Sequence, residues 1–142
     1  MPQRFERPHA ALAGSYRALV GEFTARGEPL IPFPLQFDNA DFDAFVTKLD
    51  DCARGVGLPE GFVPHSTFWL VDEGEVVGVS NLRHRLAYLL RIEGGNIGYG
   101  VRPSARRRGH ATALLRHTLG EARAVGLDEV LLTCRRRHEL AS

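Results

Sequence analysis

The sequence predicts an α/β domain, because helical and strand-like patterns alternate along one chain of ordinary composition. Apolar residues recur at helical spacing in three separate stretches, and runs rich in β-branched and aromatic residues lie between them. The chain has 142 residues, of which 44% are hydrophobic and 25% are charged. These values are typical of a soluble domain that can bury a core without disulfides or metals. We therefore expect residues 1–142 to form a single domain.

The first part of the chain is expected to hold a short strand and two helices. Residues 3–5 are a candidate strand. A helix is predicted over residues 9–26, where Gly27 ends it, and a second helix begins near Asp41 and stops at Gly55. The apolar face of the first helix consists of Leu12, Tyr16, Leu19, Val20 and Phe23, and that of the second consists of Phe42, Phe45, Val46, Leu49 and Cys52.

The segment between these helices is rich in proline and apolar residues. Pro29, Pro32 and Pro34 predict an extended connection. It is too apolar for a free linker, and a second loop over residues 56–66 carries further prolines and a glycine. We expect residues 29–37 and this loop to shape a pocket. The candidates to line it are Leu30, Ile31, Phe33 and Leu35.

Strands dominate the next part of the chain. Residues 67–71 and 75–82 are rich in strand-favouring residues and flank Glu73 and Gly74, so they predict a hairpin. Residues 86–92 begin a further strand or form a short connecting element, and the pattern leaves both open.

A strand, a turn and a helix follow. The strand is expected over residues 96–102 and ends at Pro103, and the helix after the turn stops at Gly126. A last strand is predicted over residues 130–134, which are all apolar apart from Thr133 and therefore suit burial on both faces. The helix has one face made of Ala111, Leu114, Leu115, Thr118, Leu119 and Ala122.

The turn before this helix is basic. Arg106, Arg107 and Arg108 lie where the first peptide N–H groups of the helix have no internal partner and carry partial positive charge. Three arginines at that end are unfavourable unless an anion lies among them. Gly109 allows a phosphate to approach the main chain closely, and Ala111 is expected to keep the next exposed position small. The turn therefore suits a diphosphate.

In this setting Arg106-x-x-Gly109-x-Ala111 resembles the acyl-CoA signature of the GNAT N-acetyltransferases. The resemblance extends from the first helix through Cys134, and the segments over residues 59–64 and 94–99 resemble one bacterial GNAT subgroup. It implies a GNAT-like (acyl-CoA N-acyltransferase) mixed sheet with flanking helices. It also implies transfer of an acetyl group from acetyl-CoA, the co-substrate, to a primary amine of unknown identity, either a small molecule or a peptide. The implied cofactor-binding residues are Val101, Arg106, Arg107, Arg108, Gly109, His110, Ala111 and Thr112, with the main chain around Val101 as an oxyanion hole.

Acetylation requires a neutral amine, whose pKa is otherwise about 10.4, so a base or a water chain must take its proton. Related enzymes often use a carboxylate early on the strand before the phosphate turn, and Glu93 is the nearest. Its alternative interpretation is a solvated turn residue beside Gly94. His84 is the second catalytic candidate, because its ordinary pKa suits proton relay, and its alternative is a surface histidine at a strand end. The general acid is unassigned.

GNAT proteins usually continue past the strand that corresponds to residues 130–134 with another helix and two strands. The sequence ends at Ser142, so we expect a C-terminally incomplete domain. An uncovered apolar strand would pair with another chain, and this predicts a homo-oligomer, such as a swapped dimer.

Other classes of function fit the sequence less well. The alternative to catalysis is a non-catalytic acyl-CoA-binding or regulatory module. Nucleic-acid binding by the arginine clusters is disfavoured by a net charge of only +1. No run reaches the roughly 20 apolar residues that span a membrane. Six scattered histidines, with His110 and His117 seven apart, predict no metal site. Cys52 and Cys134 lie far apart, which predicts reduced, buried thiols in the cytoplasm.

Overall fold

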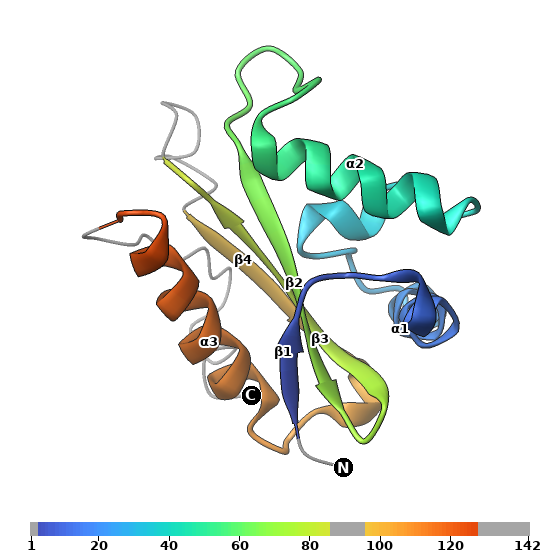
Figure 1. Ribbon diagram of the computed structural model, residues 1–142. Helices are drawn as coiled ribbons and strands as arrows, with labels where there is room; N and C mark the ends of the chain where they lie inside the picture. The colour runs from blue at the N-terminus through green and yellow to red at the C-terminus, as the bar shows by residue number, and fades with distance from the viewer. Residues whose placement is uncertain (1–2, 86–95, 128–142) are drawn as a thin grey trace.

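The computed structural model describes residues 3–85 and 96–127, which form a sheet with helices on both faces (Figure 1). The sheet order is β1-β2-β3-β4, and every neighbouring pair is antiparallel. The strands are β1 (Arg4–Glu6), β2 (His65–Asp72), β3 (Glu75–Arg83) and β4 (Ile97–Val101). The predicted α/β class and the predicted hairpin are confirmed. Residues 86–92 and 130–134, where further elements are expected, lie outside the described residues.

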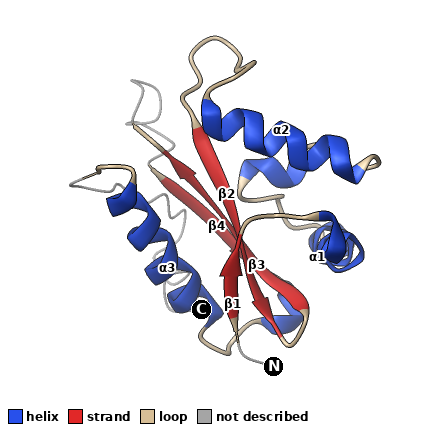
Figure 2. Ribbon diagram, in the orientation of Figure 1, coloured by secondary structure: helices blue, strands red, loops and turns tan. Residues whose placement is uncertain are grey.

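In the described residues, α-helices cover both faces of the sheet (Figure 2). Helices α1 (Ala13–Ala25) and α2 (Phe42–Arg54) pack on one face, and α3 (His110–Ala124) packs on the other. Short 3-10 turns precede or connect them: η1 (Ala10–Leu12), η2 (Phe33–Gln36) and η4 (Pro103–Ala105). The predicted first helix therefore begins as a 3-10 turn before it becomes α-helical.

Helix α2 begins and ends at the expected signals. The Asp41 side chain accepts a hydrogen bond of 3.1 Å from the Ala44 N–H, which satisfies one of the unpaired donors of the first turn. Gly55 follows the last turn with φ of 75°, a left-handed conformation that glycine adopts without strain. These two residues explain why the helix coincides with the stretch that its apolar periodicity predicts.

Two apolar cores lie on the two faces of the sheet. On the α1 and α2 face, Trp69 is fully buried and its ring stacks on Tyr16 at 5.1 Å between centroids. On the α3 face, Phe68 and Ile97 pack against the helix. The predicted helix faces are confirmed: the buried α3 residues are His110, Ala111, Leu114, Thr118 and Ala122.

The connection between α1 and α2 differs from the extended segment that the prolines predict. From Phe33 it forms the 3-10 turn η2, because the fixed φ of proline is shared by extended and 3-10 backbone. Leu35 is 2% exposed in the core, and of the four predicted pocket residues Phe33 lines the 590 Å³ cavity found in the described residues, whereas Leu30, Ile31 and Leu35 do not.

Two glycines of β4 let this connection lie directly on the sheet. A side chain built on Gly98 would contact Pro32 at 3.5 Å, and one built on Gly100 would overlap the carbonyl oxygen of Ile31. The connection and the central strand therefore meet backbone to backbone, which positions Phe33 beside the beginning of β4.

Candidate functional site

The turn from β4 into α3 is held by carboxylates at the end of α1. Glu22 accepts hydrogen bonds from Arg102 Nε at 2.6 Å and from the Ser104 N–H at 2.8 Å. Burial alone would raise the pKa of Glu22, but these donors outweigh it and lower the pKa. The turn is therefore anchored before it reaches the arginines.

Arg106 is paired inside the protein. Its two terminal nitrogens donate to the two carboxylate oxygens of Glu28 at 3.0 and 2.6 Å, and its guanidinium lies 5.7 Å from the ring centre of Phe23. The Arg106 hydrogen bonds lower the pKa of Glu28 to about 2, although burial opposes the shift. Arg106 thus fixes the turn, whereas Arg107 and Arg108 are exposed.

The N-terminus of α3 is open. Gly109 occupies the N-cap position with φ of 80°, no side chain caps the helix, and no atom outside the local chain lies within 4 Å of a side chain built on this glycine. The first main-chain bond of the helix runs from the Ala113 N–H to the Gly109 carbonyl at 3.1 Å. The peptide N–H groups that precede it remain available to an anion.

The residues predicted to bind the cofactor in the first turn of α3 differ in burial. His110 and Ala111 are buried, at 4% and 2% exposure, so the expectation that Ala111 is an exposed position is wrong. It lies on the helical face that packs against the sheet, and only its peptide group is relevant to the turn. Thr112 is exposed beside them.

Val101 presents its peptide N–H to the outer side of β4. Val101 pairs with Gly78, and the neighbouring Arg102 N–H donates to the Val77 carbonyl at 2.8 Å. In an antiparallel ladder this pattern directs the Arg102 N–H toward β3 and the Val101 N–H away from it. The alternation directs the Val101 donor to the outer edge of β4, and its role as an oxyanion-hole donor stays a prediction.

Of the two catalytic candidates, the structure describes His84 and does not describe Glu93. Glu93 lies outside the described residues. His84 is half-buried, and a hydrogen bond of 2.8 Å joins its Nε2 to Ser66 Oγ. Burial, and then the charge of Arg7, lowers its pKa. Since neighbouring side chains of a strand point to opposite faces, Ser66 and the adjacent His65 lie on opposite faces, and His84 is bound on the Ser66 side.

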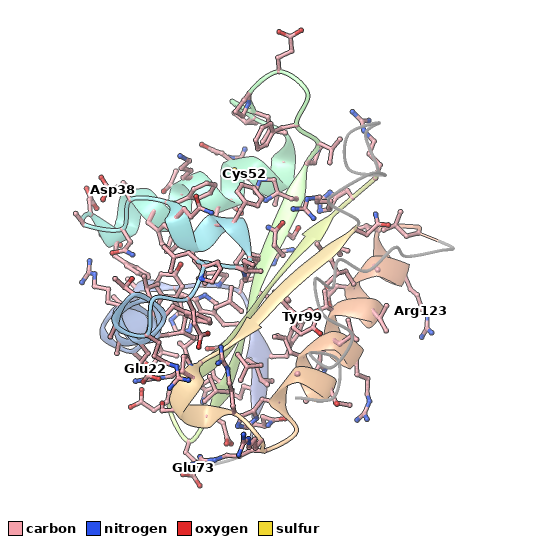
Figure 3. All side chains as sticks on the ribbon, turned by 180° about the vertical axis from the view of Figure 1, so that it is seen from behind. Glu22, Asp38, Cys52, Glu73, Tyr99 and Arg123 are labelled. Atoms are coloured by element: carbon pink, nitrogen blue, oxygen red, sulfur yellow. The ribbon has the colours of Figure 1, made fainter. Side chains whose placement is uncertain are left out.

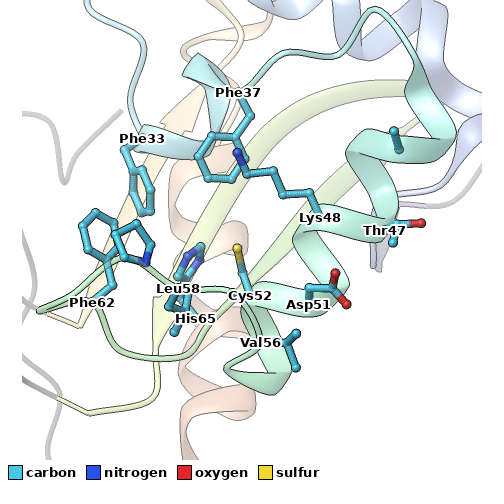
Figure 4. Close-up of a pocket in the computed structure, with 13 residues that line it drawn as sticks. Phe33, Phe37, Thr47, Lys48, Asp51, Cys52, Val56, Leu58, Phe62 and His65 are labelled. Atoms are coloured by element: carbon cyan, nitrogen blue, oxygen red, sulfur yellow. The ribbon is translucent and has the colours of Figure 1, made fainter.

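A cavity of about 590 Å³ opens on the α2 face (Figure 4). It lies between α2, η2 and the loop over residues 56–66. The turn η2 and this loop belong to the two segments expected to shape a pocket, residues 29–37 and 56–66. Its walls include Phe33, Phe37, Cys52, Val56, Leu58 and Phe62, with Lys48 and Asp51 at one side and His65 below. Figure 3 shows Cys52 in the upper half of the view and Glu22 in the lower half.

His65 is a cavity residue that sequence reasoning missed. It is 2% exposed, and the amide Nδ2 of Asn81 donates to its Nδ1 at 2.8 Å. Burial, and then the charges of Arg83 and His84, lowers its pKa to about 4. No motif signals this residue, because its role depends on a partner 16 positions away. Among the described residues, no group of three His, Cys, Asp or Glu side chains is arranged for a metal ion.

A comparison with protein families decides the assignment. The model of the Acetyltransferase (GNAT) family matches residues 30–141, which include the cavity segments and the α3 turn. The chain belongs to the GNAT family. Members of the GNAT family generally transfer an acyl group from acyl-CoA to an acceptor. No curated protein matches the chain. In the described part of this GNAT chain no helix is long and apolar enough to cross a membrane.

Proposed function

We propose that this protein is an N-acetyltransferase that transfers the acetyl group of acetyl-CoA to a primary amine. The observation that carries the proposal is the open N-terminus of α3, where Gly109 leaves free space and no side chain caps the peptide N–H groups. Two exposed arginines, Arg107 and Arg108, adjoin it. Peptide donors, helix dipole and side-chain charge together suit the diphosphate of CoA.

In the proposed arrangement Arg106 acts through the turn. Because Glu28 occupies both terminal nitrogens of Arg106, Arg106 holds the turn in shape. The phosphates are bound by Arg107, Arg108 and the peptide groups of residues 109–112. The Val101 N–H, directed away from β3, is the proposed donor to the thioester carbonyl oxygen.

The chemical step is an acyl transfer. The lone pair of the neutral amine attacks the thioester carbon, a C–N bond forms, and the C–S bond breaks with its electron pair leaving on sulfur. The amine nitrogen loses one proton and the thiolate gains one, so the products are an amide and free CoA. Glu93 and His84 remain the proposed proton acceptors, and His84 would act through Ser66 or water.

A non-catalytic acyl-CoA-binding module is the second candidate. It is favoured by the state of His65, the imidazole that lines the cavity, since its low pKa and the Asn81 contact make it unsuited to accept a proton. Activity on amines separates the two candidates, because both bind acyl-CoA and only one releases free CoA thiol.

Three further features belong to the proposal. The chain is proposed to act as a single domain, and a buried free thiol at Cys52 supports a cytoplasmic location. Self-association as a swapped dimer rests on residues 130–134, which the structure does not describe, and stays a prediction. Size-exclusion chromatography with light scattering tests it, and a monomer at all concentrations contradicts it.

Thermal unfolding with and without acetyl-CoA tests the cofactor. At about 100 times its Kd, acetyl-CoA should add roughly 2.7 kcal/mol to the free energy of unfolding. Gly109→Glu should abolish this shift, because it places a negative side chain in the proposed diphosphate site, the cradle formed by residues 106–112. The control is Gly126→Glu, since Gly126 has φ of 89° and open space at the other end of α3, so backbone strain and added charge are matched. Equal shifts in both variants would contradict the proposal that this turn binds the diphosphate of CoA.

A further inference from the structure

We propose that the 590 Å³ cavity is the acceptor site and that it selects an arylalkylamine, a primary amine attached to an aromatic ring that carries an oxygen at its far end. The ring would lie among the phenylalanines, and the oxygen would accept a hydrogen bond from His65 Nε2. This inference rests on the proposed transfer to a primary amine and adds the chemical class of that amine.

The cavity wall is suited to an aromatic ring. Phe33 forms edge contacts with Phe37, at 5.6 Å and 84°, and with Phe62, at 6.0 Å and 68°. A further ring beside such a group gains the same edge and offset contacts. The volume falls within the usual range for small-molecule sites and leaves room for ring substituents. Figure 4 shows Phe33, Phe37 and Phe62 around one opening.

The rim of the cavity exposes apolar surface. Phe62 is 49% and Val56 is 50% exposed, and in the described part of the chain only Val125 is another large hydrophobic residue of comparable exposure, at 44%. Both Phe62 and Val56 border the cavity, whereas Val125 follows α3. Exposed apolar side chains gathered at the edge of one cavity indicate a ligand that covers them.

The hydrogen bonds under the cavity fix the tautomer of His65. Asn81 Nδ2 lies 3.4 Å from the Ser66 carbonyl, which can only accept, so the nitrogen of the amide faces this side. The same nitrogen lies 2.8 Å from His65 Nδ1, which must therefore be the accepting nitrogen. The proton of the neutral imidazole is then on Nε2.

His65 Nε2 is consequently a donor at the floor of the cavity. Among the described residues no partner accepts from it, and His65 lines the cavity with its ring 5.0 Å from that of Phe33. A ligand atom that lies over Phe33 and accepts a hydrogen bond satisfies this donor. An oxygen on the far end of an aromatic ring meets both conditions.

Positive charge beside the aromatic wall excludes a polyamine. Lys48 Nζ lies 4.2 Å from the ring centre of Phe37, and the Arg83 guanidinium lies 5.7 Å from that of Phe33. The nearby Asp51 carboxylate is hydrogen-bonded to Arg54. A ligand with several ammonium groups would be repelled here, whereas a monoamine whose apolar end enters the cavity avoids the repulsion.

The cavity wall adjoins the first half of β4 through the residue before Phe33. Phe33 directly follows Pro32, which packs over Gly98 in the first half of that strand. In the proposed arrangement the amine chain of a ring bound against Phe33 extends toward β4, whose outer side carries the Val101 donor.

Binding of four amines to the full chain, measured by calorimetry without acyl-CoA, tests the class of ligand. We expect 4-methoxyphenethylamine to bind about tenfold more tightly than phenethylamine, because it adds one hydrogen bond. Phenethylamine should in turn exceed hexylamine, and spermidine should bind weakest. Equal affinity for the two aromatic amines overturns the role of His65, and tighter binding of hexylamine or spermidine overturns the aromatic class.

Variants locate the site. Phe62→Ala should weaken binding of 4-methoxyphenethylamine about tenfold, and the control Val125→Ala, which removes a similarly exposed side chain elsewhere, should leave it unchanged. His65→Gln, which retains an N–H donor, should keep the preference for the methoxy group, and His65→Phe should lose it. Equal effects of the Phe62 and Val125 changes overturn the assignment of the cavity.

Failure of the proposed acceptor class can be distinguished from failure of the proposed N-acetyl transfer. If acetyl-CoA shifts the unfolding temperature and free thiol is released with other amines while no arylalkylamine binds, this inference fails and N-acetyl transfer stands. If the arylalkylamines bind at the cavity and are not acetylated, the binding specificity stands and the proposed reaction fails.

Discussion

Glu28 and Arg106 form a fork-shaped ion pair between residues 78 positions apart, and the pair holds the cradle turn. Glu28→Gln should lower the free energy of unfolding at pH 7 by about 1 kcal/mol, because the pair is only partly buried. The depressed pKa of Glu28, about 2, means that the contribution is complete above pH 4.5 and is lost as the pH falls toward 2.

Urea unfolding measures this effect, and the chain offers a matched control. Asp50 pairs with Arg54 at 3.7 Å with both side chains 61% exposed, so Asp50→Asn should change stability very little. If the Glu28 variant is as stable as the Asp50 variant at every pH, the pair does not anchor the turn.

His65 should make the fold sensitive to mild acid. Its pKa of about 4 in the folded state lies below the ordinary value of 6.5, so the unfolded chain binds the proton more readily. Stability is therefore complete above pH 6.5 and decreases as the pH falls toward 4, by at most about 3 kcal/mol. His65→Gln removes the titrating group. Unfolding free energies at pH 7 and pH 5 should differ less in this variant, and an unchanged difference contradicts the prediction.

At the scale of elements, β4 depends on the close approach of the α1–α2 connection. Gly100→Ala should destabilise the protein by about 2 kcal/mol or more, because its new methyl group would overlap the Ile31 carbonyl oxygen and backbone must move. Gly120→Ala is the control, since Gly120 lies inside α3 with open space and should gain about 0.5–1 kcal/mol of helix stability. Similar effects of the two changes in urea unfolding would show that the contact is not tight.

The same contact shows which elements the sequence could predict. Periodicity and capping residues predict α1, α2, α3 and the β2–β3 hairpin, because these depend on neighbours in the chain. The turn η2 is not predicted, since proline favours a φ that extended and 3-10 backbone share. The reason for Gly98 and Gly100 is equally invisible in sequence, because the atoms that require glycine come from residues 31 and 32.

At the scale of the whole molecule, the two candidate sites differ in how far sequence reasoning reaches. The cradle is a contiguous segment, so its arginines and Gly109 can be recognised by spacing, although the pairing of Arg106 with Glu28 cannot. The cavity draws on η2, α2, a loop and β2, and its buried donor is defined by a contact between His65 and Asn81. A pocket could be expected from the apolar loops, but its floor required the folded sheet.

The two sites lie at opposite ends of the sheet. His65 begins β2 and lines the cavity, whereas Asp72 ends β2, with its Oδ2 3.8 Å from Nε2 of His110 in the first turn of α3. Eight residues of strand separate the ends by roughly 23 Å. The long pantetheine arm of CoA would cover most of that distance along β4. The phosphates and the amine can therefore be bound at opposite ends while the thioester reaches the amine.

This separation predicts that a substitution can abolish binding of one ligand and leave binding of the other intact. Gly109→Glu should abolish the thermal shift with acetyl-CoA and keep the shift with 4-methoxyphenethylamine, because the cavity contains no residue of α3 or its turn. Phe62→Ala should do the reverse, since its side chain touches only the cavity end. Thermal unfolding of both variants with each ligand gives the four shifts in unfolding temperature that test this prediction. Loss of both shifts in a variant that still unfolds cooperatively would mean that the ligands share one site, and the acceptor would then lie at the cradle end of β4.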